Sequence, residues 1–183
     1  MSELTIDLHS WIIQDGNYGD FAVGDVQKFA LEFAGSSLAS SRSRTPHLQH
    51  VGAGIYQACG EVIFVHPTVW VIDIGVKVFW ESSIPPFAEM GSWVEGKILL
   101  GIAPFFYKEY LRKLPDIPNL FYEWTIKRIS RNDTPLIETP NAQGGIVITR
   151  DNTREHWTDI SKTDAWEDGN GSSTYLLHAV LKA

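Results

Sequence analysis

The segment VWVIDIGVKVFW, residues Val69–Trp80, carries the strongest strand signal in the chain. Valine, isoleucine, phenylalanine and tryptophan dominate it, and these side chains pack well on a pleated sheet. Gly75 lies inside the segment, where the missing side chain would allow a strand to coil. We therefore predict one long strand from Thr68 to Trp80.

Other segments show strand signals as well, either by alternation of apolar and polar residues or by enrichment in β-branched and aromatic side chains. In the first of them, Leu4 shares a face with other apolar residues, while Asp7 and His9 point to the opposite face. The closing residues Tyr175–Leu181 are predicted to form a strand or a short helix. The remaining predicted strands cover residues 4–13, 23–33, 50–65, 93–102, 120–129 and 145–149.

The hydrophobic period changes after Pro104. Four residues then follow the i, i+3, i+4, i+7 spacing of one helix face: Tyr107, Tyr110, Leu111 and Leu114. Proline is well tolerated in the first turn of a helix, and Pro115 and Pro118 would end it. One short amphipathic helix is therefore expected over residues 104–113.

Residues 50–149 have the order strand, strand, strand, helix, strand, strand. This is the order of an OB-fold, a small Greek-key barrel with a helix between its third and fourth strands. We predict an all-β single domain over residues 1–183, with an N-terminal strand pair in 1–34, an OB-like core in 50–149, and an irregular loop and closing strand in 150–183. A β-sandwich with one small helix is the alternative, because its composition is almost the same.

Gly91–Ile98, with the sequence GSWVEGKI, also supports a barrel. It resembles the G-x-x-V-x-G-x-V opening strand of many OB-type and S1-like barrel domains. The resemblance covers eight of the 183 residues. It implies a barrel strand at this position.

The length and composition favour a soluble globular protein. A chain of 183 residues can bury a core without crosslinks. The lone cysteine, Cys59, excludes an intramolecular disulfide and a cysteine-based metal cluster. Neither a signal peptide nor an apolar run of about 20 residues is evident, so we expect a cytoplasmic protein without a membrane segment.

The formal net charge of −7 bears on the partners. Long-range repulsion disfavours nucleic acid and anionic membranes unless a local basic patch compensates. A protein partner or a homo-oligomer fits this charge better. No cofactor is expected, because phosphate-binding glycine loops are missing from the sequence. No metal is expected either: His47 and His50 have an H-x-x-H spacing, but they flank a strand start, where residues three apart point to opposite faces, and no further ligands lie nearby.

One group of candidate ligand-binding residues combines aromatic and basic side chains on a predicted strand: Tyr122, Trp124, Lys127, Arg128 and Arg131. Such interleaving could stack bases and neutralise phosphates on a barrel sheet. The alternative is a solvated strand end with a core tryptophan, because Trp124 and Lys127 point to opposite faces of a strand.

Trp157 and Trp166 form a second candidate group, within an acidic stretch that is predicted to be a surface loop. Exposed tryptophans next to carboxylates could bind a sugar or a cationic partner. The alternative is that both indoles hold the loop against the barrel.

Asp73 supports an enzymatic alternative, since a carboxylate is unusual in so apolar a strand. Burial would raise the pKa of the carboxyl group, which suits a general acid or base, with His66 or His156 as a partner. Equally, Asp73 could satisfy backbone N–H groups near Gly75. No catalytic residue is assigned from the sequence.

The sequence therefore favours a non-catalytic binding module. We expect the barrel face to bind a protein partner or an oligomeric ligand, either single-stranded nucleic acid or oligosaccharide. Two alternatives are a small enzyme with a pocket around Asp73 and a histidine, and a purely structural interaction protein.

Overall fold

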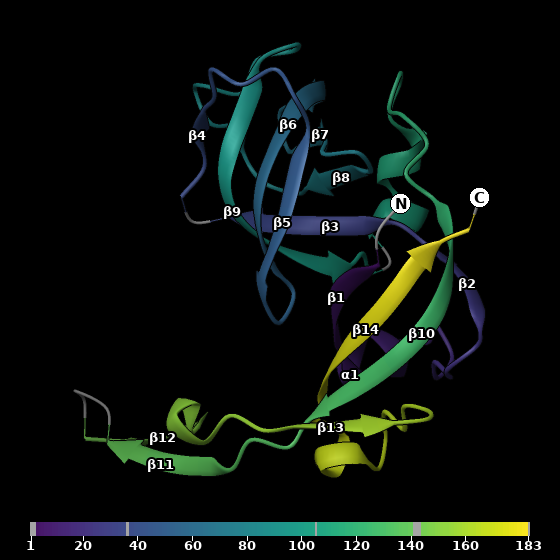
Figure 1. Ribbon diagram of the computed structural model, residues 1–183, viewed down its shortest axis with the longest axis vertical. Helices are drawn as coiled ribbons and strands as arrows, with labels where there is room; N and C mark the ends of the chain where they lie inside the picture. Colours follow the sequence, from purple (N-terminus) through teal and green to yellow (C-terminus); the bar gives the residue numbers. More distant parts are fainter. Residues whose placement is uncertain (1–2, 36, 105, 141–143, 183) are drawn as a thin grey trace.

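A computed structural model describes residues 3–35, 37–104, 106–140 and 144–182 (Figure 1). This part of the chain is mainly β. Its strands are β1 (Leu4–His9), β2 (Val26–Phe29), β3 (Leu31–Gly35), β4 (Ala39–Ser40), β5 (His47–Gly52), β6 (Ile55–His66), β7 (Val69–Asp73), β8 (Lys77–Trp80), β9 (Trp93–Ile102), β10 (Tyr122–Asn132), β11 (Leu136–Pro140), β12 (Ile146–Arg150), β13 (Trp157–Ile160) and β14 (Thr174–Leu181).

The helical segments are short. They are α1 (Ser10–Gln14), α2 (Phe106–Glu109), and the 3-10 turns η1 (Leu111–Lys113), η2 (Asn152–Arg154) and η3 (Asp168–Gly171). None of the helices in the described ranges is long and apolar enough to cross a membrane.

Five strands close into a mixed β-barrel. β9 pairs antiparallel with both β3 and β6, β6 pairs with β7, and β7 pairs with β8. The ring is closed by β3 and β8, which run parallel and match Leu31 with Val78 and Glu32 with Phe79. The predicted fold class, mainly β with a closed barrel and extra strands, is confirmed.

The strands that form the barrel differ from those predicted. β3 comes from the segment 23–33, which was expected to supply an extra strand, yet it completes the ring. The predicted barrel strands 120–129 and 145–149 correspond to β10 and β12, which lie outside the ring. Alternation of apolar residues identifies a strand and its buried face, but it does not identify the neighbouring strand.

The segment Val69–Trp80 also differs from the prediction, because it forms two strands. The chain turns between β7 and β8, with Gly75 at φ +98°, in the left-handed region that favours glycine. The Asp73 carboxylate accepts a hydrogen bond from the Gly75 N–H at 2.9 Å. Gly75 thus reverses the chain where coiling of one strand was expected.

The strands outside the barrel extend its sheet. β14 pairs antiparallel with both β1 and β10, and β10 also pairs with β2 and β13. The closing residues 175–181 thus form a strand. β1 joins this extension to the barrel by a parallel bridge between Asp7 and Gly101 of β9. Figure 1 shows β14 and β10 leaning away from the barrel.

A continuous hydrophobic core links the barrel and its extension. It contains Leu31, Trp70 and Val78 from the barrel, and Trp124 and Tyr175 from the extension. A second cluster lies where Tyr107 and Leu111 pack with Phe79. Large aromatic side chains bury much apolar area, and Trp70 and Trp124 contribute in this way because both are fully buried.

β11 and β12 form a hairpin that projects from the body and belongs to a separate two-stranded sheet (Figure 1). We call residues 136–140 and 146–150 the hairpin arm. Most of its side chains are exposed, including Leu136 and Ile148. At its base, Arg150 Nη1 donates hydrogen bonds to the carbonyl oxygens of Asn132 and Thr134, at 3.2 and 3.0 Å.

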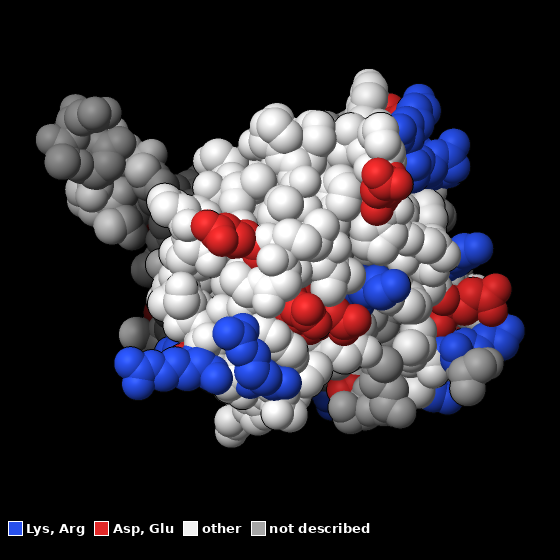
Figure 2. All heavy atoms as spheres, turned by 90° about the horizontal axis from the view of Figure 1, so that it is seen from above, with Lys and Arg blue, Asp and Glu red and all other residues white. Residues whose placement is uncertain are grey.

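The charged side chains are mixed on the face seen from above. Figure 2 shows lysine and arginine side chains in separate groups, with acidic side chains between them. The described residues of this face therefore present no continuous basic patch.

The approach of β6 to the β7–β8 turn leads to the first prediction. A Cβ on Gly60 would lie 2.7 Å from both the Asp73 carbonyl oxygen and Ile74 Cγ2, which is closer than atoms can pack. We expect Gly60→Ala to lower the free energy of unfolding by about 1–3 kcal/mol. Gly52→Ala is the matched control, since nothing lies within 4 Å of its Cβ position. Urea denaturation with equal midpoints for both variants would contradict the packing argument.

Candidate functional site

The outer face of the barrel carries a row of side chains that the sequence separates widely. Asp7 of β1 and Glu32 of β3 both lie in register with Gly101 of β9, one on each side. Residues in register on neighbouring strands share a face. A Cβ placed on Gly101 would lie 3.7 Å from Cγ and 3.8 Å from Oε1 of Glu32, so the Glu32 side chain lies over this glycine.

This row forms the floor of a cavity of about 370 Å³. Two indoles contribute to its walls, Trp11 from α1 and Trp80 from the end of β8. We call this cavity the acidic lobe, and its residues are Asp7, His9, Trp11, Glu32, Phe33, Ala34, Trp80, Glu81, Leu99, Gly101 and Pro104. Among the described residues, no group of three or more histidine, cysteine, aspartate or glutamate side chains is placed to hold a metal ion.

The surroundings of Glu32 in the acidic lobe favour its protonated form. Burial, assisted by the negative charges of Glu81 and Asp7, raises the pKa of Glu32 to about 7, while His9 acts in the opposite direction. Glu32 is therefore protonated in part at neutral pH. A positive charge placed beside Glu32 would favour the ionised form of its carboxyl group.

His9 is held between two side chains. Its Nε2 lies 3.1 Å from Asp7 Oδ2, and its Nδ1 lies 3.3 Å from Thr174 Oγ1. The hydrogen bond to Asp7 raises the pKa of His9, and this effect outweighs burial, which lowers it. The imidazole thus offsets part of the negative charge of the acidic lobe.

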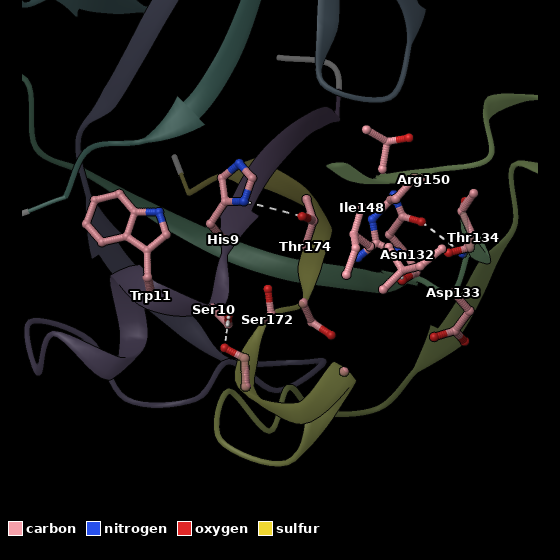
Figure 3. A pocket seen from close by; sticks show the side chains of 15 residues that line it. His9, Ser10, Trp11, Asn132, Asp133, Thr134, Ile148, Arg150, Ser172 and Thr174 are labelled. Carbon is pink, nitrogen blue, oxygen red and sulfur yellow. Dashed lines mark hydrogen bonds between the residues drawn. The ribbon is translucent and has the colours of Figure 1, made fainter. Parts of the chain in front are cut away.

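A second cavity, of about 590 Å³, lies between the body and the hairpin arm (Figure 3). His9 and Trp11 line both cavities, so the two are adjacent. We call the second cavity the arm lobe. Figure 3 shows Ile148 and Arg150 of the arm across from His9 and Trp11, with Ser10 and Ser172 also lining it.

The arm lobe has an apolar wall and a polar floor. Leu136 and Ile148 of the arm supply the apolar wall and are 63% and 64% exposed. Hydroxyl, amide and guanidinium groups supply the floor, but several already have partners. For example, Ser10 Oγ donates to the Gly171 carbonyl oxygen at 3.0 Å, and Arg150 donates to backbone carbonyls. The acidic lobe is lined by three carboxyl groups, from Asp7, Glu32 and Glu81, whereas Asp133 is the carboxylate among the residues that line the arm lobe.

The predicted aromatic ligands on β10 are not displayed on the surface. Trp124 is fully buried, its ring stacks on Phe29, and its Nε1–H donates to the Phe29 carbonyl oxygen at 3.3 Å. Tyr122 is half-buried, and its hydroxyl accepts a hydrogen bond from the Lys77 N–H at 3.2 Å. Trp124 is thus a core residue and is unavailable to stack on a ligand.

The predicted basic residues do not gather at one place on the surface. Lys127 is exposed. Arg131 is held by the carboxylates of Asp133 and Asp168, which neutralise its charge. Arg128 lies apart from this cluster, with its Nη2 3.2 Å from His178 Nδ1.

Of the seven predicted ligand-binding residues, Arg128 and Trp157 are brought together. They line a depression of about 390 Å³ together with Ser130, Asp159 and His178. Burial lowers the pKa of His178, and the positive charge of Arg128 lowers it further. Trp166 is 67% exposed and lies apart from this depression.

The residues of the enzymatic alternative are spread over the molecule. Asp73 lies opposite Glu61 at the end of β7, whereas His66 lies opposite Val69 at its beginning. His156 precedes β13 and lies 3.4 Å from Thr158 Oγ1. None of the cavities described above is lined by these side chains. The hydrogen bond from Gly75 N–H gives Asp73 a structural role.

Sequence reasoning missed the acidic lobe. The alternation in β1 places Asp7 and His9 on the outer face, which is the one local signal in the sequence. Their meeting with Glu32 depends on strand register, and register between distant strands has no local signature.

Comparison with known protein families, with curated proteins and with solved structures finds no match to this chain. The candidate site therefore stands on its own geometry.

The raised pKa of Glu32 leads to a prediction about stability. Because the folded-state pKa lies above the unfolded value, ionised Glu32 destabilises the fold, and the cost grows as the pH rises from about 4.5 to about 7. We expect Glu32→Gln to raise the free energy of unfolding at pH 8 by roughly 1–3 kcal/mol. Most of this gain should vanish at pH 4.5, where the wild-type side chain is protonated in the folded state.

Chemical denaturation at pH 8 and pH 4.5 measures the difference. Glu89→Gln serves as the control, because Glu89 is exposed in the loop between β8 and β9. An equal effect of Glu32→Gln at both pH values would contradict the burial of an ionisable Glu32.

Proposed function

We propose that this protein is a non-catalytic binding module, and that the acidic lobe holds a positively charged side chain of a protein partner. The observation that carries the proposal is the placement of Asp7 and Glu32 on the two strands that flank Gly101, where both residues line one cavity of about 370 Å³.

The charge balance of the lobe supports a cation. Asp7, Glu32 and Glu81 outnumber His9, and burial together with repulsion by the other two carboxylates keeps Glu32 partly protonated. A guanidinium or ammonium group between Asp7 and Glu32 would replace this repulsion with attraction, and Glu32 would release its proton on binding. Arginine matches two carboxylates well, because its planar guanidinium donates in several directions.

The two indoles support the same ligand. Trp11 is 47% exposed and Trp80 is half-buried, so both have accessible surface beside the carboxylates. A cation near an indole face gains further attraction. Large exposed aromatic groups next to charged groups are also typical of protein-binding surfaces.

The partner is proposed to be a protein, not a nucleic acid. Phosphates would be repelled by the acidic lobe and by the net charge of −7. We expect no binding of single-stranded oligonucleotides even at low salt, where phosphate contacts are strongest.

A small arginine derivative tests the proposal. We expect N-acetylarginine amide to change the tryptophan fluorescence and to bind about tenfold more tightly at pH 8 than at pH 6, since Glu32 ionises between these values. Glu32→Gln should weaken binding and remove most of this pH dependence. Glu89→Gln should change neither.

Gly101→Ala provides a second variant. Its methyl group would lie at ordinary contact distance from Glu32 and Asp7, so the protein should keep its stability while the floor of the lobe is filled. We expect several-fold weaker binding of the arginine derivative. Binding of a neutral oligosaccharide in place of the arginine derivative would overturn the proposal.

Acid–base catalysis is a second function that one observation favours. Glu32, with a pKa of about 7, lies near the His9–Asp7 pair in a cavity with aromatic walls. A carboxyl group with such a pKa suits proton transfer at neutral pH, and paired carboxylates hydrolyse glycosides. A panel of nitrophenyl glycosides tests it. Hydrolysis that Glu32→Gln abolishes would support catalysis, and absence of turnover would reject it.

A further inference from the structure

The acidic lobe lies at one end of a series of outward-facing rows of side chains that cross β9. The first three rows start at Gly101, Leu99 and Lys97, which are spaced two residues apart and lie on the outer face, and a further row follows at the exposed Glu95. The residues between them point into the core, as the buried Ile98 and Leu100 show. Every second residue of β9 therefore contributes one side-chain position to the outer face.

The second row is apolar. Ile55 of β6 and Ala34 of β3 lie in register with Leu99, one on each side. Ile55 is 39% exposed and Leu99 is 38% exposed. These residues and Trp80 line a cavity of about 420 Å³. Because Ala34, Trp80 and Leu99 also line the acidic lobe, the two cavities are adjacent.

The third row is basic. Lys97 lies in register with Gln57 of β6, and its exposed side chain lines the apolar cavity. Along β9 the outer face thus changes from acidic to apolar to basic. Neighbouring rows are about 6.8 Å apart, since each step covers two residues of a strand.

We propose that the partner binds through an extended peptide segment with a basic residue at position i, an aliphatic residue at i+2 and an acidic residue at i+4. An extended peptide repeats its side chains at the same spacing as the three rows. Its basic residue would face Asp7 and Glu32, its aliphatic residue Leu99, and its acidic residue Lys97. This inference rests on the proposed function for its first row.

Short synthetic peptides test the charge pattern. The probes are Ac-Arg-Thr-Leu-Thr-Glu-amide and the same peptide with lysine in place of glutamate. The reversed sequences are included, because side chains alone contact the three rows and the chain direction is therefore not fixed. Tryptophan fluorescence or calorimetry gives the affinities. In at least one direction, we expect the wild-type protein to prefer the glutamate peptide by about fivefold.

Lys97→Glu provides the decisive variant. It should reverse the preference, so that the lysine peptide binds more tightly. Lys127→Glu is the matched control, because Lys127 is an exposed lysine on β10, outside the three rows, and it should leave the preference unchanged. Leu99→Ser should weaken both peptides. Urea denaturation checks that the variants are folded, which we expect because all three side chains are exposed.

The outcomes separate this inference from the proposed function. If Glu32→Gln weakens both peptides but Lys97→Glu leaves their ratio unchanged, the three-row inference is overturned and the cation site stands. If neither the peptides nor the arginine derivative bind, the cation site fails and the inference fails with it. Reversal of the preference by Lys97→Glu, together with loss of affinity in Glu32→Gln, supports both.

Discussion

The parallel pairing of β3 with β8 is the constraint on which the rest of the structure depends. Leu31 and Val78 meet across this pair and are fully buried, together with Phe79. Without the pair, the curved sheet would have two open edges, and strand edges expose unpaired N–H and C=O groups. Closure satisfies these groups and encloses the side chains of the inner face in one core. The pair joins strands that are far apart in the chain, so it forms at a considerable cost in loop entropy.

The same pairing creates the acidic lobe. Because side chains alternate along a strand, burial of Leu31 forces Glu32 to the outer face beside Gly101 and Asp7. The hydrophobic core therefore holds in place a carboxyl group that is unfavourable when ionised. Proteins often place strained or destabilising groups where they bind ligands, and the surrounding fold supplies the stabilisation.

The sequence predicted the fold class better than the site. Composition and period-two alternation identify the strands, because they depend on neighbouring residues. The turn at Gly75 was missed since a glycine inside an apolar run is compatible with either coiling or reversal. Trp124 shows why site residues are harder to predict. Its sequence pattern fits both a core residue and an exposed ligand-binding residue, and only its packing against Phe29 shows that it is a core residue. The acidic lobe needs the register of three strands, which no local pattern contains.

The hairpin arm should open more easily than the barrel, so the stability of this protein against local opening is not uniform. A two-stranded ribbon is marginally stable in water, and the exposed side chains of the arm add little packing. Its amide protons should therefore exchange with solvent through local opening, whereas those of the buried side of β9 should exchange only when the barrel unfolds. A protease would meet the arm first and could cut it while the barrel stays closed. Because the arm supplies one wall of the arm lobe, that wall is the part of the cavity that local opening would remove first.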